Sequence, residues 1–186
     1  MNPLKEFVLP VSGLSFGVHE YQFKINSNFF KLIEGATLID GVFDVKLFFD
    51  KRPDLFILDF EIEGFLDTDC DRCLASIELP ISESFQLIVK LTNEIEEIDD
   101  DEGDIIFLSP AVDEFDVSIY IYEYIMLSIP ILKKYDCELT VPRPCNMEVL
   151  NKYDQLSNAE TDSVEEEPKR NKLWDVLKDF DKEDNN

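Results

Sequence analysis

The side chains in this sequence best suited to metal or redox chemistry are its four cysteines. Two of them stand in the segment Cys70-Asp71-Arg72-Cys73, and Cys137 and Cys145 follow later in the chain. A two-residue spacing lets two thiolates reach one zinc ion, and the later pair could complete a tetrahedral set. Because Cys137 and Cys145 are seven residues apart, the loop between them would have to fold both thiols back to the metal.

Three interpretations of these cysteines remain open: ordinary reduced thiols, a structural zinc site and a redox pair. Four cysteines in 186 residues are too few for a disulfide scaffold. A redox pair of the thioredoxin type follows a strand and opens a helix in a βαβ unit, and no such pattern surrounds Cys70. We therefore expect reduced thiols and no cofactor. Zinc held by Cys70, Cys73, Cys137 and Cys145 is the alternative.

Other residue patterns that support catalysis are missing from the sequence. His19 is the only histidine, which excludes mechanisms and metal sites that need two imidazoles. No nucleophile elbow, zinc-hydrolase helix, phosphate-binding loop or dinucleotide-binding turn occurs. The run Asp99-Asp100-Asp101-Glu102 lacks the spaced ligands of an EF-hand loop. We therefore expect a protein that is not an enzyme and has no small-molecule substrate.

The charge of the chain limits the partners that it can bind. Its 41 acidic and 17 basic residues give a net charge of −24, and residues 94–104 alone hold eight acids and no base. We expect this acidic loop to be solvated and mobile. Affinity for nucleic acid depends on clustered Lys and Arg, and the basic dipeptides here are scattered. Such a surface should repel bare RNA.

The composition and length predict one folded domain in the cytoplasm. Hydrophobic residues make up 45% of the chain and include 15 phenylalanines, which is enough to bury a core. No apolar run approaches the ~20 residues that a membrane helix needs. The first residues also lack the basic-then-apolar layout of a secretory signal.

Alternation of apolar and polar residues predicts a sheet. Residues 43–49 and 56–62 place apolar side chains at every second position, on either side of a turn at 50–54. This pattern is typical of half-buried strands and predicts a hairpin. Residues 77–91 continue it with Pro80 on the other parity, so we expect two strands or one bent strand with the proline at a sheet edge. Shorter strands are expected near residues 7–9, 20–25 and 105–108.

Two or three short helices should accompany the strands. One is expected after a cap at Ser27 or Asn28. Another is expected over residues 117–127, capped by Asp116 and ended by Pro130. Its predicted inner face consists of Val117, Ile121, Tyr124, Ile125 and Ser128. Together these elements predict an α+β, mainly β fold, in which an antiparallel sheet curls into a sandwich or a partly closed barrel.

The chain should divide into a body and a flexible C-terminal tail. Residues 1–150 form the predicted mainly β domain, and residues 151–170 have the acidic, polar composition of a flexible linker. Residues 171–182 then place apolar side chains at helical spacing, which predicts a short amphipathic helix. This helix either docks on its own domain or is offered to a partner. Its predicted partner-binding residues are Leu173, Trp174, Leu177 and Phe180.

Three elements of the sequence recur together in a known family. The turn Cys70-Asp71-Arg72-Cys73-Leu74 follows two predicted strands, a hydrophobic helix ends at a proline, and residues 171–177 follow an acidic linker. In these elements the sequence resembles the YceD family, known as large-ribosomal-RNA accumulation proteins. Many members carry a second pair of CxxC type, and the different spacing here puts a shared zinc site in doubt. The residues that match the family motif are Cys70, Arg72, Cys73, Glu123 and Pro130.

The resemblance implies a bacterial cytoplasmic factor needed for normal levels of large-subunit ribosomal RNA, and it implies no enzymatic activity. The net charge of −24 makes a basic ribosomal protein or assembly factor the expected partner, because acidic surfaces speed association with basic proteins. Direct RNA binding is the second choice. The rival interpretations are a metal-dependent RNA-processing enzyme, which needs carboxylates converging on Mg²⁺ in one cleft, and a zinc-binding structural module.

Overall fold

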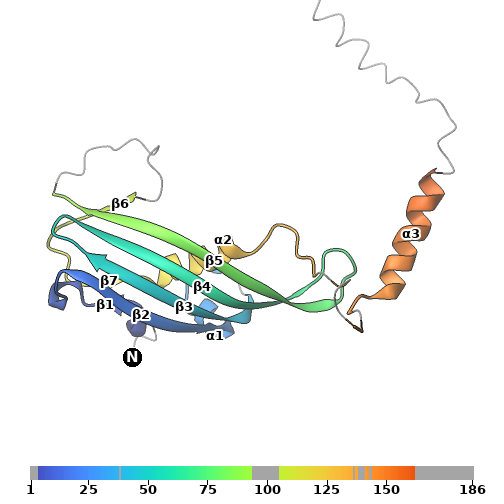
Figure 1. Cartoon of the computed structure of the whole chain (residues 1–186), viewed down its shortest axis with the longest axis horizontal. Coiled ribbons are helices and arrows are strands. Elements are labelled where there is room, and N and C mark those ends of the chain that lie inside the picture. The colour runs from blue at the N-terminus through green and yellow to red at the C-terminus, as the bar shows by residue number, and fades with distance from the viewer. Residues whose placement is uncertain are drawn as a thin grey trace, which may run out of the picture. The chain divides into compact units, whose positions relative to one another are not determined.

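The computed structural model describes residues 4–37, 39–93, 105–135, 137, 141–142 and 144–161. The chain divides into two compact units, Met1–Pro144 and Cys145–Asn186. All the strands that the structure describes belong to the first unit. They form a five-stranded sheet of order β2-β3-β4-β5-β6 and a two-stranded sheet of β1 and β7 (Figure 1).

Four long antiparallel strands make up most of the larger sheet. They are β2 (Gly17–Asn26), β3 (Asp40–Lys51), β4 (Leu55–Asp69) and β5 (Ser76–Leu91). The predicted hairpin is confirmed as β3 and β4. Every second side chain on these two strands is buried because the apolar residues alternate with polar ones. The buried set is Phe43, Val45, Leu47, Phe49, Phe56, Leu58, Phe60 and Ile62.

The strand β5 is continuous, and among the described strands only its last part has neighbours on both sides. β6 (Ile105–Leu108) pairs with Ile88–Leu91 alone, so Pro80 pairs with β4 but with no second described strand. The expected proline at a sheet edge is confirmed. Glu83 lies on the same side of β5 as the core residues, yet it is exposed. The Glu83 carboxylate therefore interrupts the apolar side of β5 in the part of the strand that pairs with β4 alone among the described strands.

The pairing of β5 with β6 is parallel, so the larger sheet is mixed. A parallel pair needs a connection of about a dozen residues or more, and residues 92–104 supply that length. The predicted class, mainly β with short helices, is confirmed. Within the described residues, however, the sheet is not closed into a barrel.

One face of the sheet is covered by α1 (Ser27–Phe30) and α2 (Ser118–Ser128) (Figure 1). The side chain of Asn26 caps α1, not Ser27 or Asn28 as predicted, and it accepts the Asn28 N–H at 2.9 Å. The N-cap of α2 is Val117, not Asp116 as predicted, although the Asp116 carboxylate one residue earlier accepts the Ser118 N–H at 2.8 Å. The predicted inner face of α2 is confirmed, since all five residues are buried: Val117, Ile121, Tyr124, Ile125 and Ser128.

The N-terminal segment covers the rest of the same face. It comprises the 3₁₀ turns Lys5–Phe7 and Val11–Gly13 and strand β1 (Val8–Leu9), which pairs with β7 (Phe115–Asp116). Lys51 Nζ donates hydrogen bonds at 2.8 Å to the carbonyls of Val11 and Leu14. These bonds fasten the segment to the end of β3.

The second unit contains α3 (Met147–Thr161), where the sequence predicts a flexible linker from residue 151. Residues 151–161 of the predicted linker are helical, and the division into domain, linker and tail helix stays a prediction. Asn146 caps this helix by accepting the N–H groups of Glu148 and Val149, and no glycine or proline interrupts the sequence that follows. Residues 162–170 of the predicted linker and the predicted helix 171–182 lie outside the described residues. No described helix is long and apolar enough to span a membrane.

Candidate functional site

The turn between β4 and β5 holds the cysteine pair. The Cys70 N–H donates to the Ala75 carbonyl, and the Leu74 N–H donates to the Cys70 carbonyl, both at 2.8 Å. Leu74 has a φ of 56°, in the left-handed region that costs a residue with a side chain about 1–2 kcal/mol. Cys70 and Cys73 are buried, whereas Arg72 is exposed. The turn therefore shelters both thiols and presents the guanidinium to solvent.

The same turn fastens the segment that follows α2. The Asp71 N–H donates to the Lys133 carbonyl at 2.9 Å, and the Lys133 N–H donates to the Asp71 carboxylate at 2.7 Å. Lys133 Nζ also lies 4.0 Å from that carboxylate. These contacts join two segments that are some sixty residues apart in sequence.

The Cys70 sulfur accepts hydrogen bonds from both segments. Burial by itself raises the pKa of the Cys70 thiol, but these hydrogen bonds outweigh the burial. The donors are the backbone N–H groups of Arg72, Tyr135 and Cys73 and the Cys73 thiol. The pKa of Cys70 consequently lies below its ordinary value, because the same donors stabilise the thiolate.

The structure brings two of the four candidate zinc ligands together. Cys70 and Cys73 share a hydrogen bond, and Cys137 is buried two residues beyond the segment that contacts Cys70. Cys145 belongs to the second unit. None of the four is in a disulfide. Among the described residues, no group of three or more His, Cys, Asp or Glu side chains is arranged to hold a metal ion. The absence of zinc stays a prediction.

The second candidate site is the face of the sheet opposite α1 and α2, which we call the open face. Its side chains occupy the alternate positions of β2 to β5, and they are exposed or half-exposed. On this face acids predominate and stand beside three bases: Lys24, Lys46 and Lys90. The acids are Glu20, Asp40, Asp44, Asp50, Asp59, Glu61, Glu63, Asp67, Asp69 and Glu78.

Several of these carboxylates face each other across neighbouring strands. Asp40 lies opposite Asp67, Asp67 lies opposite Glu78, and Asp44 lies opposite Glu63. Side chains directly opposite are about 5 Å apart at Cβ, and like charges there destabilise a sheet. Within the described residues, only Asp40 of these five accepts a hydrogen bond, from a serine hydroxyl. The other four carboxylates form no ion pair with the described lysines and arginines.

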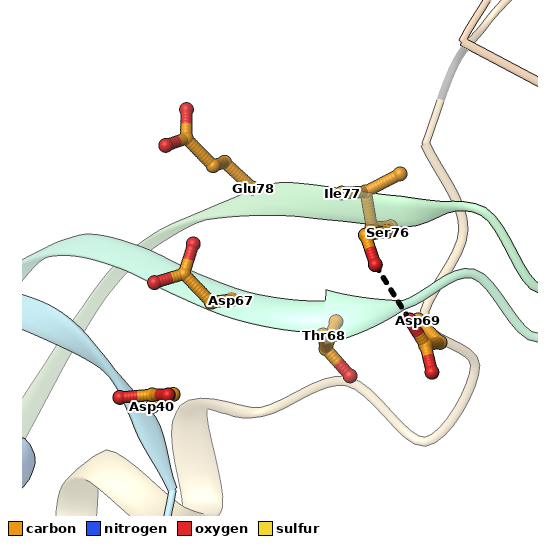
Figure 2. Close-up of a pocket in the computed structure, with 7 residues that line it drawn as sticks. All are labelled: Asp40, Asp67, Thr68, Asp69, Ser76, Ile77 and Glu78. Atoms are coloured by element: carbon orange, nitrogen blue, oxygen red, sulfur yellow. Dashed lines mark hydrogen bonds between the residues drawn. The ribbon is translucent and has the colours of Figure 1, made fainter.

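One end of the open face is hollowed into a depression of about 480 Å³. Figure 2 shows Asp67 and Glu78 projecting to the same side of β4 and β5, with Asp40 beside them on β3. This is where carboxylates of a metal-dependent enzyme could gather, but in the described part of the chain they do not converge on one point. The arrangement is an extended acidic surface. Its lining residues are Asp40, Asp67, Thr68, Asp69, Ser76, Ile77 and Glu78.

A comparison with protein families decides the relationship that the cysteine turn and α2 suggest. The family described as "Large ribosomal RNA subunit accumulation protein YceD" matches residues 58–181, more than half of the chain. The chain belongs to the YceD family. The name of the YceD family links its members to accumulation of the large ribosomal RNA. No curated protein and no solved structure matches the chain.

The residues that match the YceD motif lie in two places. Cys70, Arg72 and Cys73 form the turn described above, while Glu123 is exposed on α2 and Pro130 is exposed just beyond its end. Burial raises the pKa of the neighbouring Tyr120, and the charges of Glu123 and Asp116 raise it further. The predicted partner-binding residues lie outside the described residues: Leu173, Trp174, Leu177 and Phe180.

The gathering of acids on the open face is the feature of the candidate site that the sequence analysis did not locate. The sequence did contain a sign of it, because the polar positions that alternate with the buried ones include acids such as Asp44, Glu61 and Asp67. The sequence does not give the strand register, which aligns acids from three strands on one face.

Proposed function

We propose that this protein supports the accumulation of large-subunit ribosomal RNA as a non-enzymatic factor that binds a basic ribosomal protein or assembly factor. The observation that carries the proposal is the open face, where ten acids stand beside three bases. Membership of the YceD family supplies the link to ribosomal RNA.

Electrostatics favours a basic protein over RNA as the direct partner. Phosphate groups are repelled by a surface whose carboxylates outnumber its ammonium groups, whereas lysines and arginines are attracted to it. A basic protein also reduces the repulsion between carboxylates that face each other, such as Asp67 and Glu78. Binding and folding therefore stabilise one another.

The same electrostatics allow the basic partner to be transferred from the open face to RNA. Ribosomal RNA carries a much denser negative charge than this face, and neutralising its phosphates releases condensed counterions. RNA consequently competes for the basic residues of the partner. A factor of this kind shields a basic protein until it reaches its site on the RNA.

Neutralising four carboxylates of the open face tests the proposal in cells. The variant carries Asp44→Asn, Glu63→Gln, Asp67→Asn and Glu78→Gln and is the only copy of the protein. We expect the ratio of large-subunit to small-subunit ribosomal RNA to fall toward that of cells lacking the gene. A basic ribosomal or assembly protein that co-purifies with the parent at low salt should be lost from the variant, and from the parent at high salt.

A matched control removes the same charge from segments outside the larger sheet. It carries Glu6→Gln, Glu34→Gln, Asp113→Asn and Glu114→Gln, all at exposed positions. The control should keep the parental RNA ratio and the co-purifying protein. A four-carboxylate variant with the parental ratio and the parental partner would refute the proposal.

A further inference from the structure

A row of apolar side chains crosses the open face between its acids. Val42 on β3 lies opposite Phe65 on β4, and Phe65 lies opposite Pro80 on β5. Val42 is 60% exposed, Phe65 is 56% exposed, and Pro80 is exposed. Since residues directly opposite on neighbouring strands touch, the three form one continuous patch, which we call the Phe65 row.

Acids border the Phe65 row on both sides. Asp44 and Glu63 lie two residues away along β3 and β4 in one direction, and Asp67 and Glu78 lie two residues from Phe65 and Pro80 in the other. Two residues of a strand span about 7 Å, which is within reach of a lysine or arginine whose neighbour contacts Phe65. An apolar strip is thus placed between two rows of carboxylates.

We propose that the Phe65 row and the acids beside it form a docking site for a basic protein segment that carries an apolar side chain between lysines or arginines. This inference rests on the proposed function and adds the kind of segment recognised. The apolar side chain packs on Phe65, and the flanking cations pair with the carboxylates on either side. Aromatic residues at the centre of a charged rim are typical of binding hot spots.

The charges of the open face favour this occupant over the alternatives. A second copy of the chain would bring its own excess of acids against these carboxylates. RNA would bring phosphates to the same place. A basic segment without an apolar residue would satisfy the acids but leave the Phe65 row in water, so it should bind less tightly.

The test uses two synthetic peptides and the full-length protein. In the first peptide, leucines alternate with lysines and arginines, and in the second, serines replace the leucines. We expect the leucine peptide to bind more tightly and to shift backbone amide signals of β3, β4 and β5 around Phe65 in NMR spectra. Phe65→Thr, which keeps a good strand-forming residue, should weaken binding of the leucine peptide about tenfold, a typical hot-spot effect. It should leave the serine peptide unaffected.

Phe16→Thr is the matched control, because Phe16 is 67% exposed and precedes β2, away from the acidic rows. It should bind both peptides as the parent does, and circular dichroism should show all variants folded. Equal binding of the leucine peptide to Phe65→Thr and the parent would overturn the inference. The inference would also be overturned if the peptide shifted only amide signals of other surfaces. The same holds if an RNA oligonucleotide displaced the peptide and itself shifted the signals around Phe65. A parental dimer in sedimentation velocity that Phe65→Thr dissociates would assign the row to a second copy instead.

The two proposals can fail separately. If the four-carboxylate variant lowers the RNA ratio while Phe65→Thr binds the leucine peptide normally, the proposed function stands and the Phe65 row is not the recognition site. If peptide binding depends on Phe65 while the four-carboxylate variant keeps the parental RNA ratio, the docking site stands and the proposed function falls.

Discussion

A single added methyl group at Gly64 should destabilise the fold by about 2 kcal/mol or more. A Cβ at this position would lie 2.3 Å from the Val42 carbonyl oxygen and 2.7 Å from the Phe43 Cα, and both neighbours are backbone atoms. Relief requires β3 and β4 to separate within their ladder, where Gly64 lies opposite Phe43. Overpacking of this kind costs about 1–3 kcal/mol, and each weakened ladder hydrogen bond adds about 1 kcal/mol. The smaller conformational entropy of unfolded alanine offsets only about 0.4–1 kcal/mol.

The matched control is Gly13→Ala, because a Cβ on Gly13 meets nothing within 4 Å. This variant should stay within about 0.5 kcal/mol of the parent or gain slightly in stability. Urea unfolding followed by far-ultraviolet circular dichroism measures both free energies. A Gly64→Ala protein as stable as the control would show that β3 and β4 are not in close contact there. The register that aligns the Phe65 row would then be wrong.

Four further predictions concern the cysteines, the acidic loop and the tail. Metal analysis of protein purified without chelators should find no stoichiometric zinc, and one equivalent per chain would contradict this. The pKa of Cys70 is lowered in the folded state, so the stability of the parent relative to Cys70→Ala should be greatest above the ordinary thiol pKa. That advantage should decline as the pH falls through the folded-state pKa, and a pH-independent difference in urea unfolding would refute the assignment. Replacing the eight acids of residues 94–104 with serine should change the free energy of unfolding by less than about 0.5 kcal/mol. Shortening the segment should instead break the pairing of β6 with β5, because a parallel pair needs a long connection. Replacing Trp174 and Leu177 with alanine should weaken partner binding by about 2 kcal/mol in calorimetry and leave the melting temperature nearly unchanged; a lower melting temperature with normal binding would place these residues in the core.

Sequence patterns correctly predicted the strands and helices whose buried side can be recognised from their own residues alone. The apolar alternation of residues 43–49 and 56–62 was sufficient for the hairpin, because each strand buries one side against the same core. The inner face of α2 followed from its helical spacing in the same way. The cap of α1 was misplaced by one or two residues, since several neighbouring polar side chains could accept a backbone N–H group there.

Features that depend on distant segments were not predictable from one sequence. The parallel pairing of β6 depends on how residues 92–104 return to β5, which composition does not reveal. The joining of the cysteine turn to Lys133 depends on the position of α2 relative to β4. Polar composition also concealed α3, because polar residues form solvated helices as well as linkers. The candidate site belongs to this group, since its acids come from four strands, β2 to β5, and meet only after the sheet has assembled.

The part of β5 around Pro80 and Glu83, which has no second neighbour among the described strands, carries features that oppose aggregation. Unpaired strand edges invite intermolecular sheet growth, and natural proteins block it with prolines and with charges on the apolar side of the edge strand. Pro80 lacks an N–H to donate, and Glu83 would be buried by an incoming strand. Pro80 and Glu83 therefore disfavour the addition of a further strand along this part of β5, whether that strand comes from another copy of the chain or from a different protein.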